Sequence, residues 1–523
     1  MSADADAIVV GAGHNGLVCA LRLAAAGWRV LVLERGARIG GGLASAEVTR
    51  PGFRHDLYAT NVGAFAALPL YRERRAEFEA AGLRLVVGER PFATAYDDGS
   101  AARMYRDDAR AEAEFAAFGA ADLAGWKALS ALFRRRAAQF LPLQATALPS
   151  LAAWRRAAAL AAASPADALA LARLARQSAL DFVDAHFASA CAKGLFLPWA
   201  FHPDYAPEIP GGGIVAFIAA CATQANGLAF AAGGAGRIAT ALGILLERAG
   251  AQLRTGCAVR RIVVRGGRAV AVETDAGETI GASRAIVANV TPRSLFGGLV
   301  AAEDLPAAFL RRIGRYRYAP GTFVVHLALS RALEWRAGEE LSQFSYVHLN
   351  ADGASISTAY AQSIAGAIPA RPMLCVSQPS VDDPLRAPPG QQVVRIHARA
   401  FPARIGGDAA GRIAARDWDS AKPAVAERLL EQLAAHAPNL REVLLDAYAV
   451  SPADLKRENP NWVGGDCSSG SQHLDQHYFA RPLLGWSRYA TPLRNLYMTG
   501  AATWPGSGAH GLSGELLAAR LLD

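Results

Sequence analysis

The strongest constraint on the fold is the pattern of residues 7–34, in which two apolar runs flank a glycine-rich turn and an amphipathic stretch. A short apolar run predicts a buried strand, and apolar positions three and four residues apart predict a helix. This order is typical of a β-α-β unit in an α/β fold. Its parts are a predicted strand at 7–10, the G-x-G-x-x-G glycines Gly11, Gly13 and Gly16, the helical positions Leu17, Ala20, Leu21 and Ala24, the cap residue Gly27 and a predicted strand at 28–33.

The glycines of such a unit have separate physical functions. Gly11 permits a tight turn, Gly13 lets the backbone approach a pyrophosphate, and Gly16 lets the helix pack against the strand. The helix N-terminus offers unpaired N–H groups and the positive end of its dipole to phosphates. Glu34, 18 residues after Gly16, is placed to accept hydrogen bonds from ribose hydroxyls. We therefore predict that this unit binds a dinucleotide.

A second glycine-rich turn, at Arg38 and residues 40–42, follows the unit. A nicotinamide-binding domain does not need this turn, whereas backbone without a β-carbon can pass close to the pyrophosphate of a flavin dinucleotide. With the strings GAGHNGL, LER and PGF, this part of the chain resembles the amino-terminal motif of the phytoene-desaturase-like FAD-dependent oxidoreductases. These are related to the amine-oxidase-like flavoproteins and include pyridine nucleotide-disulfide oxidoreductase-domain proteins. The resemblance implies noncovalently bound FAD.

Two later segments carry the same resemblance. Residues 228–290 have the order glycine turn, helix, strand and β-meander of the family's middle segment, in which the residue matching Val259 holds the adenine through its backbone. Residues 496–514 resemble the carboxy-terminal flavin motif, although residues 505–508 are P-G-S-G where relatives commonly have P-G-G-G, so what lies over the flavin stays open. The implied cofactor-binding residues are Gly11, Gly13, His14, Asn15, Gly16, Glu34, Arg35, Arg38, Gly40, Gly41, Gly42, Val259, Gly500, Ala501, Gly511 and Leu512.

The predicted fold class is α/β, with a Rossmann-type FAD-binding domain assembled from three chain segments and an α+β substrate domain that has an antiparallel sheet and a helical insertion. The Ala-, Leu- and Arg-rich region 107–187 has helical spacing, with breaks near Pro149 and at Ser164-Pro165. Strands are predicted at 83–87, 92–96, 101–105, 322–329, 373–378 and 391–398, and a helix at 424–436. The expected boundaries are 1–75, 216–300 and 456–523 for the FAD-binding domain and 76–215 and 301–455 for the substrate domain.

Length and composition exclude several classes of protein. A chain of 523 residues with 52% hydrophobic content is neither disordered nor too small for several domains. Its net charge of +8 is spread out, so we expect no nucleic-acid partner. No run of about 18 uncharged apolar residues suits a membrane span, and no leader precedes the first predicted strand, so we expect a cytoplasmic protein.

The cysteines predict neither a redox disulfide nor a metal site. The six are scattered, without a C-x-x-C pair or zinc spacing, and are expected to be buried thiols. They are Cys19, Cys191, Cys221, Cys257, Cys375 and Cys467.

A second glycine motif resembles a nicotinamide site but is not interpreted as one. Gly234, Gly236 and Ala239 form G-x-G-x-x-A, and Arg254 stands where a 2′-phosphate of NADP would need a cation. However, Cys257 occupies the position of the expected acid, and a β-meander follows. We therefore expect NADH and NADPH not to reduce the flavin quickly.

Three functions remain compatible with the sequence. The favoured one is an FAD-dependent dehydrogenase or desaturase that moves a hydride from a largely apolar small molecule to the flavin, with oxygen or a quinone as possible acceptor. The second is an amine oxidase, which often places aromatic rings around the amine, and Trp462, Trp486 and Trp504 keep it open. The third is a non-catalytic flavin-bound regulator. The oligomeric state is open.

One residue is singled out as a candidate acid or base. His510 lies between the Gly508 turn and the last predicted helix, and an ordinary pKa near 6.5 suits proton transfer. The alternative is that it caps the backbone. His202, His473, His477 and Tyr478 are weaker candidates for the same cleft.

A peripheral membrane contact is the last expectation from the sequence. Basic residues and an aromatic anchor within the helical region are typical of a helix that lies on a membrane surface, although a solvated helix face has the same composition. These residues are Arg134, Arg135, Arg136, Trp154, Arg155 and Arg156.

Overall fold

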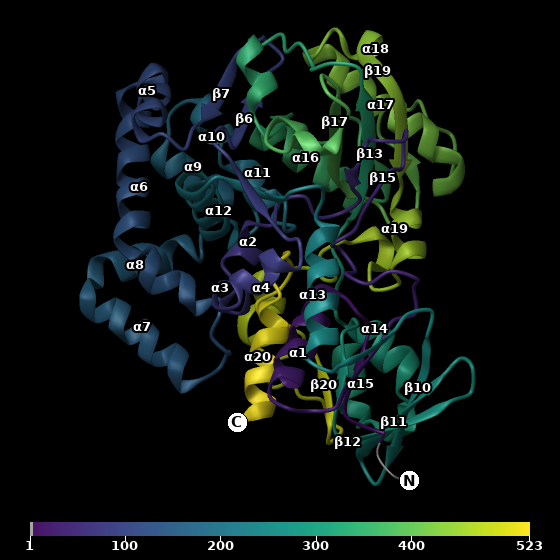
Figure 1. Cartoon of the computed structure of the whole chain (residues 1–523). Helices are drawn as coiled ribbons and strands as arrows, with labels where there is room; N and C mark the ends of the chain where they lie inside the picture. The colour runs from purple at the N-terminus through teal and green to yellow at the C-terminus, as the bar shows by residue number, and fades with distance from the viewer. Residues whose placement is uncertain (1–3) are drawn as a thin grey trace.

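The computed structural model describes residues 4–523, which form two large sheets and a helical part (Figure 1). The first sheet lies at the lower end of the view and the second at the upper end, with the helices from α5 (Asp108–Phe118) to α8 (Pro165–Leu174) along one side. The described chain begins in the first sheet, and its carboxy-terminal end lies beside that sheet.

The first sheet is the predicted nucleotide-binding sheet. Its order is β10-β11-β12-β1-β2-β9, with β20 paired to β12. The core strands are parallel, and β10, β11 and β12 form an antiparallel meander. Three separate chain segments supply its strands, which confirms the predicted assembly, while the domain boundaries themselves stay predictions. The strands are β1 (Ala5–Val10), β2 (Val30–Leu33), β9 (Gln252–Arg254), β10 (Val259–Arg265), β11 (Arg268–Thr274), β12 (Thr279–Ala288) and β20 (Leu496–Met498).

Helix α1 (His14–Ala25) joins the two ends of the chain. It packs against the last helix, α20 (Leu512–Leu522), beside it in Figure 1, and against α13 (Gly236–Arg248). A Cβ on Gly514 would lie 1.9 Å from the Asn15 carbonyl oxygen, so only glycine allows this approach. Because the ends of the chain meet here, the carboxy-terminal segment is held at the first glycine loop.

The second sheet has two chemically different faces. Val394, Ile396 and Ala398 of β17 pack on the apolar core beneath helix α17 (Trp418–His436). The alternate residues Arg395 and His397 point to the other face, which looks into the cavity described below. The strand order is β19 (Leu444–Val450), β13 (Gly321–Leu329), β17 (Gln392–Phe401), β16 (Leu374–Ser377), β14 (Tyr346–Leu349), β6 (Phe92–Ala95) and β7 (Ala101–Met104).

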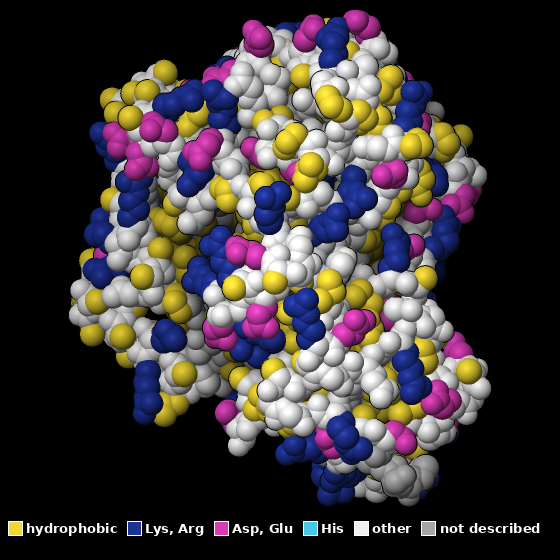
Figure 2. Space-filling view, viewed as in Figure 1, with side chains coloured by type: hydrophobic (Ala, Val, Ile, Leu, Met, Phe, Trp, Pro, Cys, Tyr) yellow, Lys and Arg dark blue, Asp and Glu magenta, His cyan; other side chains and the backbone are white. Residues whose placement is uncertain are grey.

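The helical insertion follows the sequence prediction closely. Ser150 caps α7 and Ser164 caps α8, each through a side-chain oxygen that accepts a backbone N–H, so the two predicted breaks are confirmed. Helices α7 and α8 project from the body, and Figure 2 shows hydrophobic side chains on their outer surface. The helices are α5 (Asp108–Phe118), α6 (Ala120–Phe140), α7 (Leu151–Ala163), α8 (Pro165–Leu174), α9 (Ala179–His186), α10 (Ala190–Gly194), α11 (Leu197–Phe201) and α12 (Gly212–Asn226).

Several elements were not predicted from the sequence, namely α12, β14, β19, β8 and α16. Helix α12 is apolar around most of its circumference because it lies inside the helical part, so it has no amphipathic period. Helix α17 begins at Trp418 rather than 424, and Pro423 lies inside it. The remaining elements are β3 (Ser45–Ala46), β4 (His55–Asp56), α2 (Gly63–Ala66), α3 (Pro69–Glu73), α4 (Arg75–Ala80), β5 (Leu85–Gly88), β8 (Leu228–Ala231), α14 (Pro292–Ser294), α15 (Ala307–Ile313), α16 (Gly353–Ile364), β15 (Ala367–Ile368), β18 (Gly407–Asp408), α18 (Leu440–Val443) and α19 (Pro452–Glu458).

Within residues 4–523, no helix is both long enough and apolar enough to cross a membrane.

Candidate active site

A cavity of about 740 Å³ is lined by both sheets. Its wall includes Gly13 and Glu34 of the first sheet's β-α-β unit, Gly500 after β20, and His397 of the second sheet. Residues from the two ends and the middle of the chain therefore meet around one space.

The two glycine turns touch each other at the floor of this cavity. Gly40 donates its N–H to the Ala12 carbonyl at 2.7 Å. A Cβ on Gly41 would lie 3.1 Å from the Gly13 Cα, and one on Gly13 would lie 2.8 Å from the Asn289 amide nitrogen. The close approach expected of backbone without β-carbons is thus present.

Glu34 is held by backbone donors at the end of β2. One carboxylate oxygen accepts the Ala12 N–H at 2.8 Å and the other accepts the Gly36 N–H at 2.8 Å. Each oxygen keeps a lone pair for a further donor, such as a ribose hydroxyl. Beside it, Arg35 donates to backbone carbonyls at the end of α19, and Arg38 pairs with Glu458 at 2.7 Å.

The residues at the start of α1 fit a bound dinucleotide. The Asn15 side-chain oxygen is buried at the cavity and has no hydrogen-bond partner within residues 4–523. Buried acceptors are nearly always bonded, so this atom calls for a donor from a ligand or from water. His14 lies 3.0 Å from the Gly508 carbonyl through Nε2, and burial lowers its pKa to about 4. Together with the glycine cradle and Glu34, this orphaned oxygen fits FAD.

The carboxy-terminal loop completes the cradle. Gly500 has φ +110°, and a Cβ there would lie 2.8 Å from the Asn289 side-chain oxygen. The Ser513 hydroxyl accepts the Gly500 N–H at 3.0 Å and lies 2.6 Å from the Thr503 hydroxyl. The last helix therefore positions the loop that lines the cavity.

Beyond the cradle, the cavity reaches the polar face of β17. Arg395, His397 and Arg399 line it there, together with His202 at the end of α11. Desolvation lowers the pKa of His202 to about 3 and holds the pKa of His397 well below its usual value, so both rings are neutral near pH 7. The positive charge on this face therefore comes from the arginines.

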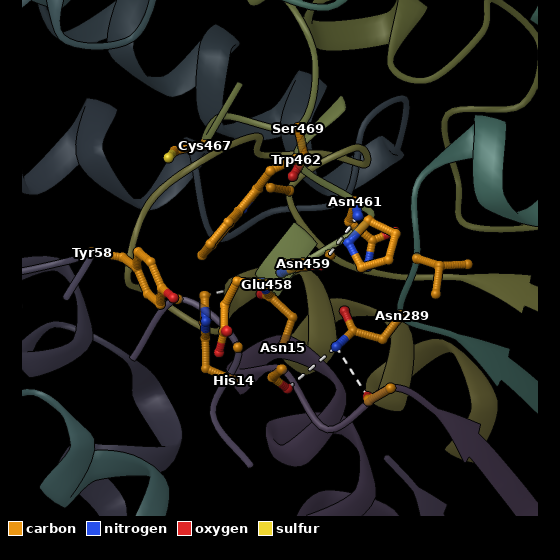
Figure 3. A pocket seen from close by; sticks show the side chains of 18 of the residues that line it. His14, Asn15, Tyr58, Asn289, Glu458, Asn459, Asn461, Trp462, Cys467 and Ser469 are labelled. Carbon is orange, nitrogen blue, oxygen red and sulfur yellow. Dashed lines mark hydrogen bonds between the residues drawn. The ribbon is translucent and has the colours of Figure 1, made fainter. Parts of the chain in front are cut away.

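Two aromatic rings form an apolar part of the wall. Tyr58 and Trp462 line the cavity with their ring centroids 4.4 Å apart in an edge-to-face arrangement (Figure 3). Such a pair offers apolar ring surface to a ligand.

Comparison with known proteins agrees with this geometry. Residues 16–522 match the family of flavin containing amine oxidoreductases. The chain belongs to this family.

Its curated relatives match over nearly their whole length. The chain is 27% identical to mouse (Mus musculus) pyridine nucleotide-disulfide oxidoreductase domain-containing protein 2, with 98% of this chain and 92% of the relative covered. It is 27% identical to phytoene dehydrogenase of Streptomyces griseus, with 98% of this chain and 94% of the relative covered. It is 23% identical to one of the limonene dehydrogenase chains of Castellaniella defragrans, with 96% of this chain and 91% of the relative covered.

Solved structures show the same fold. An oxidoreductase from Methanosarcina mazei is similar with a TM-score of 0.61 at 16% identity, covering 98% of this chain and 99% of that one. Putrescine oxidase is similar with a TM-score of 0.61 at 14% identity, covering 99% of both chains. The protein is thus an FAD-dependent oxidoreductase of the flavin-containing amine oxidoreductase family.

The structure separates the cofactor residues inferred from the sequence into two groups. One group packs helices and turns together and is not among the described residues that line the cavity: Gly16, Gly40, Gly511 and Leu512. A Cβ on Gly16, for example, would lie 2.6 Å from the Gly11 carbonyl oxygen. The residues that line the cavity are Gly11, Gly13, His14, Asn15, Glu34, Arg35, Arg38, Gly41, Gly42, Val259, Gly500 and Ala501.

His510 is likewise not among the described residues that line the cavity. Its Nδ1 accepts the N–H of Leu512, the first residue of α20, at 3.0 Å. Desolvation lowers its pKa to about 3. This arrangement favours the capping alternative over proton transfer at neutral pH.

The weaker candidates divide in the same way. Of the three tryptophans only Trp462 is among the described lining residues, since Trp504 donates to the Thr146 carbonyl at 2.9 Å and Trp486 packs on Phe309. Of the other candidates, only His202 lines the cavity, whereas His473, His477 and Tyr478 are not among its described lining residues.

Sequence reasoning missed two kinds of site residue. Asn289 follows β12 and was not singled out as a site residue, although a polar residue directly after a buried strand was a usable signal. Arg395, His397 and Arg399 alternate with apolar residues along 392–401, and this alternation predicts a strand with one polar face. The face is buried, which periodicity alone does not reveal.

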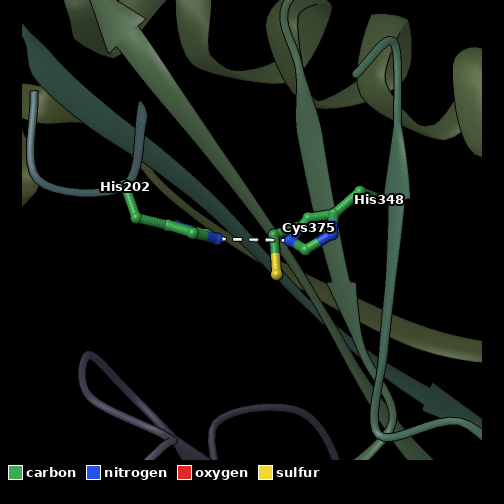
Figure 4. Close-up of side chains that lie close together, drawn as sticks. All are labelled: His202, His348 and Cys375. Carbon is green, nitrogen blue, oxygen red and sulfur yellow. Dashed lines mark hydrogen bonds between the residues drawn. The ribbon is translucent and has the colours of Figure 1, made fainter. Parts of the chain in front are cut away.

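One group within residues 4–523 has the composition of a metal site: His202, His348 and Cys375, whose ligand atoms lie within 4.8 Å of one another (Figure 4). The two Nε2 atoms are 3.3 Å apart, as in a hydrogen bond, and burial raises the pKa of Cys375 to about 12, so its thiol stays protonated. The buried Nδ1 of His348 has no partner, whereas a metal-ligating histidine normally donates its second N–H. The geometry favours a hydrogen-bonded pair, and the expectation of no metal stays a prediction.

The second glycine motif is closed by side chains of the protein itself. At the start of α13, Asp56 accepts the Ala235 N–H at 2.7 Å and Ser45 accepts the Gly236 N–H at 3.0 Å. Arg254 pairs with Glu278 at 3.1 Å. The donors that would hold a phosphate are thus already used.

Proposed function

We propose that the protein is a dehydrogenase or oxidase that removes a hydride from a C–H bond of an organic small molecule. Bound FAD supplies the hydride acceptor of this reaction. The observation that carries the proposal is the single cavity shared by the nucleotide cradle and the polar face of β17, because a substrate there would lie beside the cofactor.

The chain's own residues would orient such a substrate and exclude water. Val324, Tyr58 and Trp462 offer apolar surface, in line with the largely apolar substrate expected from the sequence. The relatives named for phytoene and limonene dehydrogenation also favour this chemistry. Oxygen or a quinone is the proposed electron acceptor.

Amine oxidation is the second candidate, and the aromatic pair Tyr58–Trp462 is the observation in its favour. The positive charge of Arg395 and Arg399 on the same cavity wall counts against it, because a protonated amine would meet like charge there. We therefore rank dehydrogenation of a non-amine substrate first.

Anaerobic mixing of the flavin-loaded protein with a panel of alcohols, unsaturated acids, terpenes and amines tests the proposal. The expected result is loss of the visible flavin band with a non-amine substrate and its return on admission of oxygen or a quinone. Bleaching by amines alone would favour the amine oxidase. If dithionite reduces the flavin but no organic compound does, the non-catalytic regulator becomes the better hypothesis.

A further inference from the structure

Arg395 is a buried cation without a counter-charge. It lies on β17, opposite His326 of β13 and Ser377 of β16. The residue is 7% exposed and lines the cavity. Its Nε has no hydrogen-bond partner, and no carboxylate within residues 4–523 forms an ion pair with its guanidinium. Burial of a charge is costly unless a partner compensates it.

Two arginines that are buried more deeply are fully supplied with acceptors. Arg386 pairs with Asp56 at 2.6 Å and with Asp383 at 2.6 Å. Arg481 donates to backbone carbonyls, among them that of Ala501 at 2.9 Å. These two guanidinium groups have acceptors supplied by the protein, whereas Arg395 faces the cavity.

The polar groups around Arg395 do not supply a negative charge. Burial raises the pKa of the Tyr346 hydroxyl and raises the pKa of Cys467 to about 11, so both groups are neutral near pH 7. His326 is neutral because burial, with a smaller contribution from the positive charge of Arg395, holds its pKa well below its usual value. Asp56, the acid whose field reaches Arg395, is already bonded to Arg386.

We propose that Arg395 binds a carboxylate group of the substrate inside the cavity. The inference rests on the proposed function, because it assigns a chemical class to the substrate of the same site. A planar guanidinium matches a carboxylate with two parallel hydrogen bonds and opposite charge.

The neighbouring residues are consistent with this class of ligand. Arg399 lies on the same face and donates to the Thr322 hydroxyl at 3.1 Å and the Ser468 hydroxyl at 3.3 Å. Its positive charge therefore also attracts an anion, although part of its guanidinium is already hydrogen-bonded. Tyr58 and Trp462 line the same cavity and offer their rings to an apolar body. The substrate is thus an apolar molecule with one acidic end, rather than a pure hydrocarbon.

Binding of carboxylate probes to the flavin-loaded protein tests the inference without turnover. Benzoate and hexanoate are titrated against their neutral amides, benzamide and hexanamide, with the visible flavin spectrum and the melting temperature as readouts. The carboxylates are expected to perturb the spectrum and raise the melting temperature, and the amides to bind at least about 30-fold more weakly.

Arg395→Met removes the charge with little change of volume and is expected to weaken benzoate binding at least about 30-fold, whereas Arg395→Lys keeps part of the affinity. Arg404→Met, an exposed arginine of the same domain, is the matched control and should bind benzoate as the parent does. Equal affinity for benzoate and benzamide, or unchanged benzoate binding in Arg395→Met, would overturn the inference.

Two further outcomes would also count against it. If Arg395→Met shifts the flavin spectrum without any probe, the residue acts on the cofactor, and if phenyl phosphate binds much more tightly than benzoate, the ligand class is wrong. Failure of the proposed function is distinguishable, because it would leave carboxylate binding intact while no compound reduces the flavin.

Discussion

Asn289 donates its side-chain amide to the carbonyl oxygen of Gly11 at 3.1 Å. The same amide lies 3.3 Å from the Gly13 carbonyl, so a residue of the middle segment fixes the first glycine turn (Figure 3). Because Gly500 also packs against Asn289, this one side chain contacts all three segments of the cradle.

Asn289→Ala is therefore expected to weaken FAD binding. The change leaves two carbonyls without their donor and opens space behind Gly13, at a cost of about 1–3 kcal/mol, or about 5- to 140-fold in Kd. Quenching of flavin fluorescence on titration of the apoprotein measures it. Asn226→Ala, at an exposed helix end, is the control, and equal losses in both variants would contradict a local effect.

Glu34→Ala is expected to weaken FAD binding by a comparable or larger factor. It removes the acceptor of the Ala12 and Gly36 N–H groups and of the ribose hydroxyls, and charge-assisted bonds contribute roughly 1.5–3 kcal/mol each. Glu34→Gln keeps one acceptor oxygen and should lie between parent and alanine. Chromatography of heat-released cofactor identifies the bound nucleotide, and FMN, NAD alone or no nucleotide in a folded preparation would contradict the assignment.

The cradle was predictable from the sequence because its chemistry is local. The turn at Gly11, the close approach at Gly13 and the acid at the end of β2 follow from short-range backbone geometry, so spacing alone reveals them. The polar face of β17 was not predictable in this way. Its chemistry depends on which core each face of the strand packs against. Helix α17 covers the apolar face, so Arg395 and His397 on the other face look into the cavity.

His510 shows the same limit at one residue. Its position beside the last helix was predictable, but whether it reaches the cavity depends on the preceding loop, whose residues 507–509 line the cavity in its place. A position close in sequence to a cofactor motif is therefore not enough to place a side chain in the cavity.

His510→Ala tests the two functions of this residue. As a cap, it should contribute about 1 kcal/mol to the stability of α20, and the variant should reduce its flavin as fast as the parent once FAD occupancy is matched. His510→Asn, which keeps an acceptor, should recover the stability. A 10²–10⁴-fold slower anaerobic reduction in both variants would instead identify His510 as the acid or base.

Buried neutral histidines predict lower stability in acid. Burial lowers the pKa of His55 to about 3 and holds those of His326 and His348 well below 6.5, so the unfolded chain binds more protons than the native one as the pH falls below 6.5. Each group then contributes a loss of about 1.4 kcal/mol per pH unit below that value. Asp204 acts in the opposite direction, because burial raises its pKa to about 6, so protonation favours the folded state.

The melting temperature is therefore expected to fall steadily from pH 7 to pH 5, and scanning fluorimetry of the flavin-loaded protein measures this. In His326→Leu the slope against pH should be smaller, because one buried titrating ring is removed. A flat profile from pH 7 to pH 5 would contradict the neutral state of these rings.

The final prediction concerns the projecting helices as a surface for anionic membranes. Of the arginines expected to form this surface, Arg134 pairs with Asp108, and Arg135 and Arg136 share Asp167. Two carboxylates therefore offset part of the charge of these three arginines. Arg155 and Arg156 of α7 are exposed, and no ion pair within residues 4–523 joins them.

The apolar part of this surface is also on α7 and α8. Leu151 and Trp154 are each 64% exposed, and Leu169 is 53% exposed. A basic pair beside an exposed tryptophan is typical of a helix at a membrane interface.

We expect the protein to sediment with vesicles that contain phosphatidylglycerol and less with pure phosphatidylcholine. Exchange of both Arg155 and Arg156 for alanine should lower binding about 10- to 30-fold, since each basic residue near an anionic surface contributes about 1 kcal/mol. Trp154→Ser should lower it further through loss of apolar contact. Arg134→Ala is the control, because its charge is already paired with Asp108. Equal sedimentation of the double variant and the parent would show that α7 is an ordinary solvated helix.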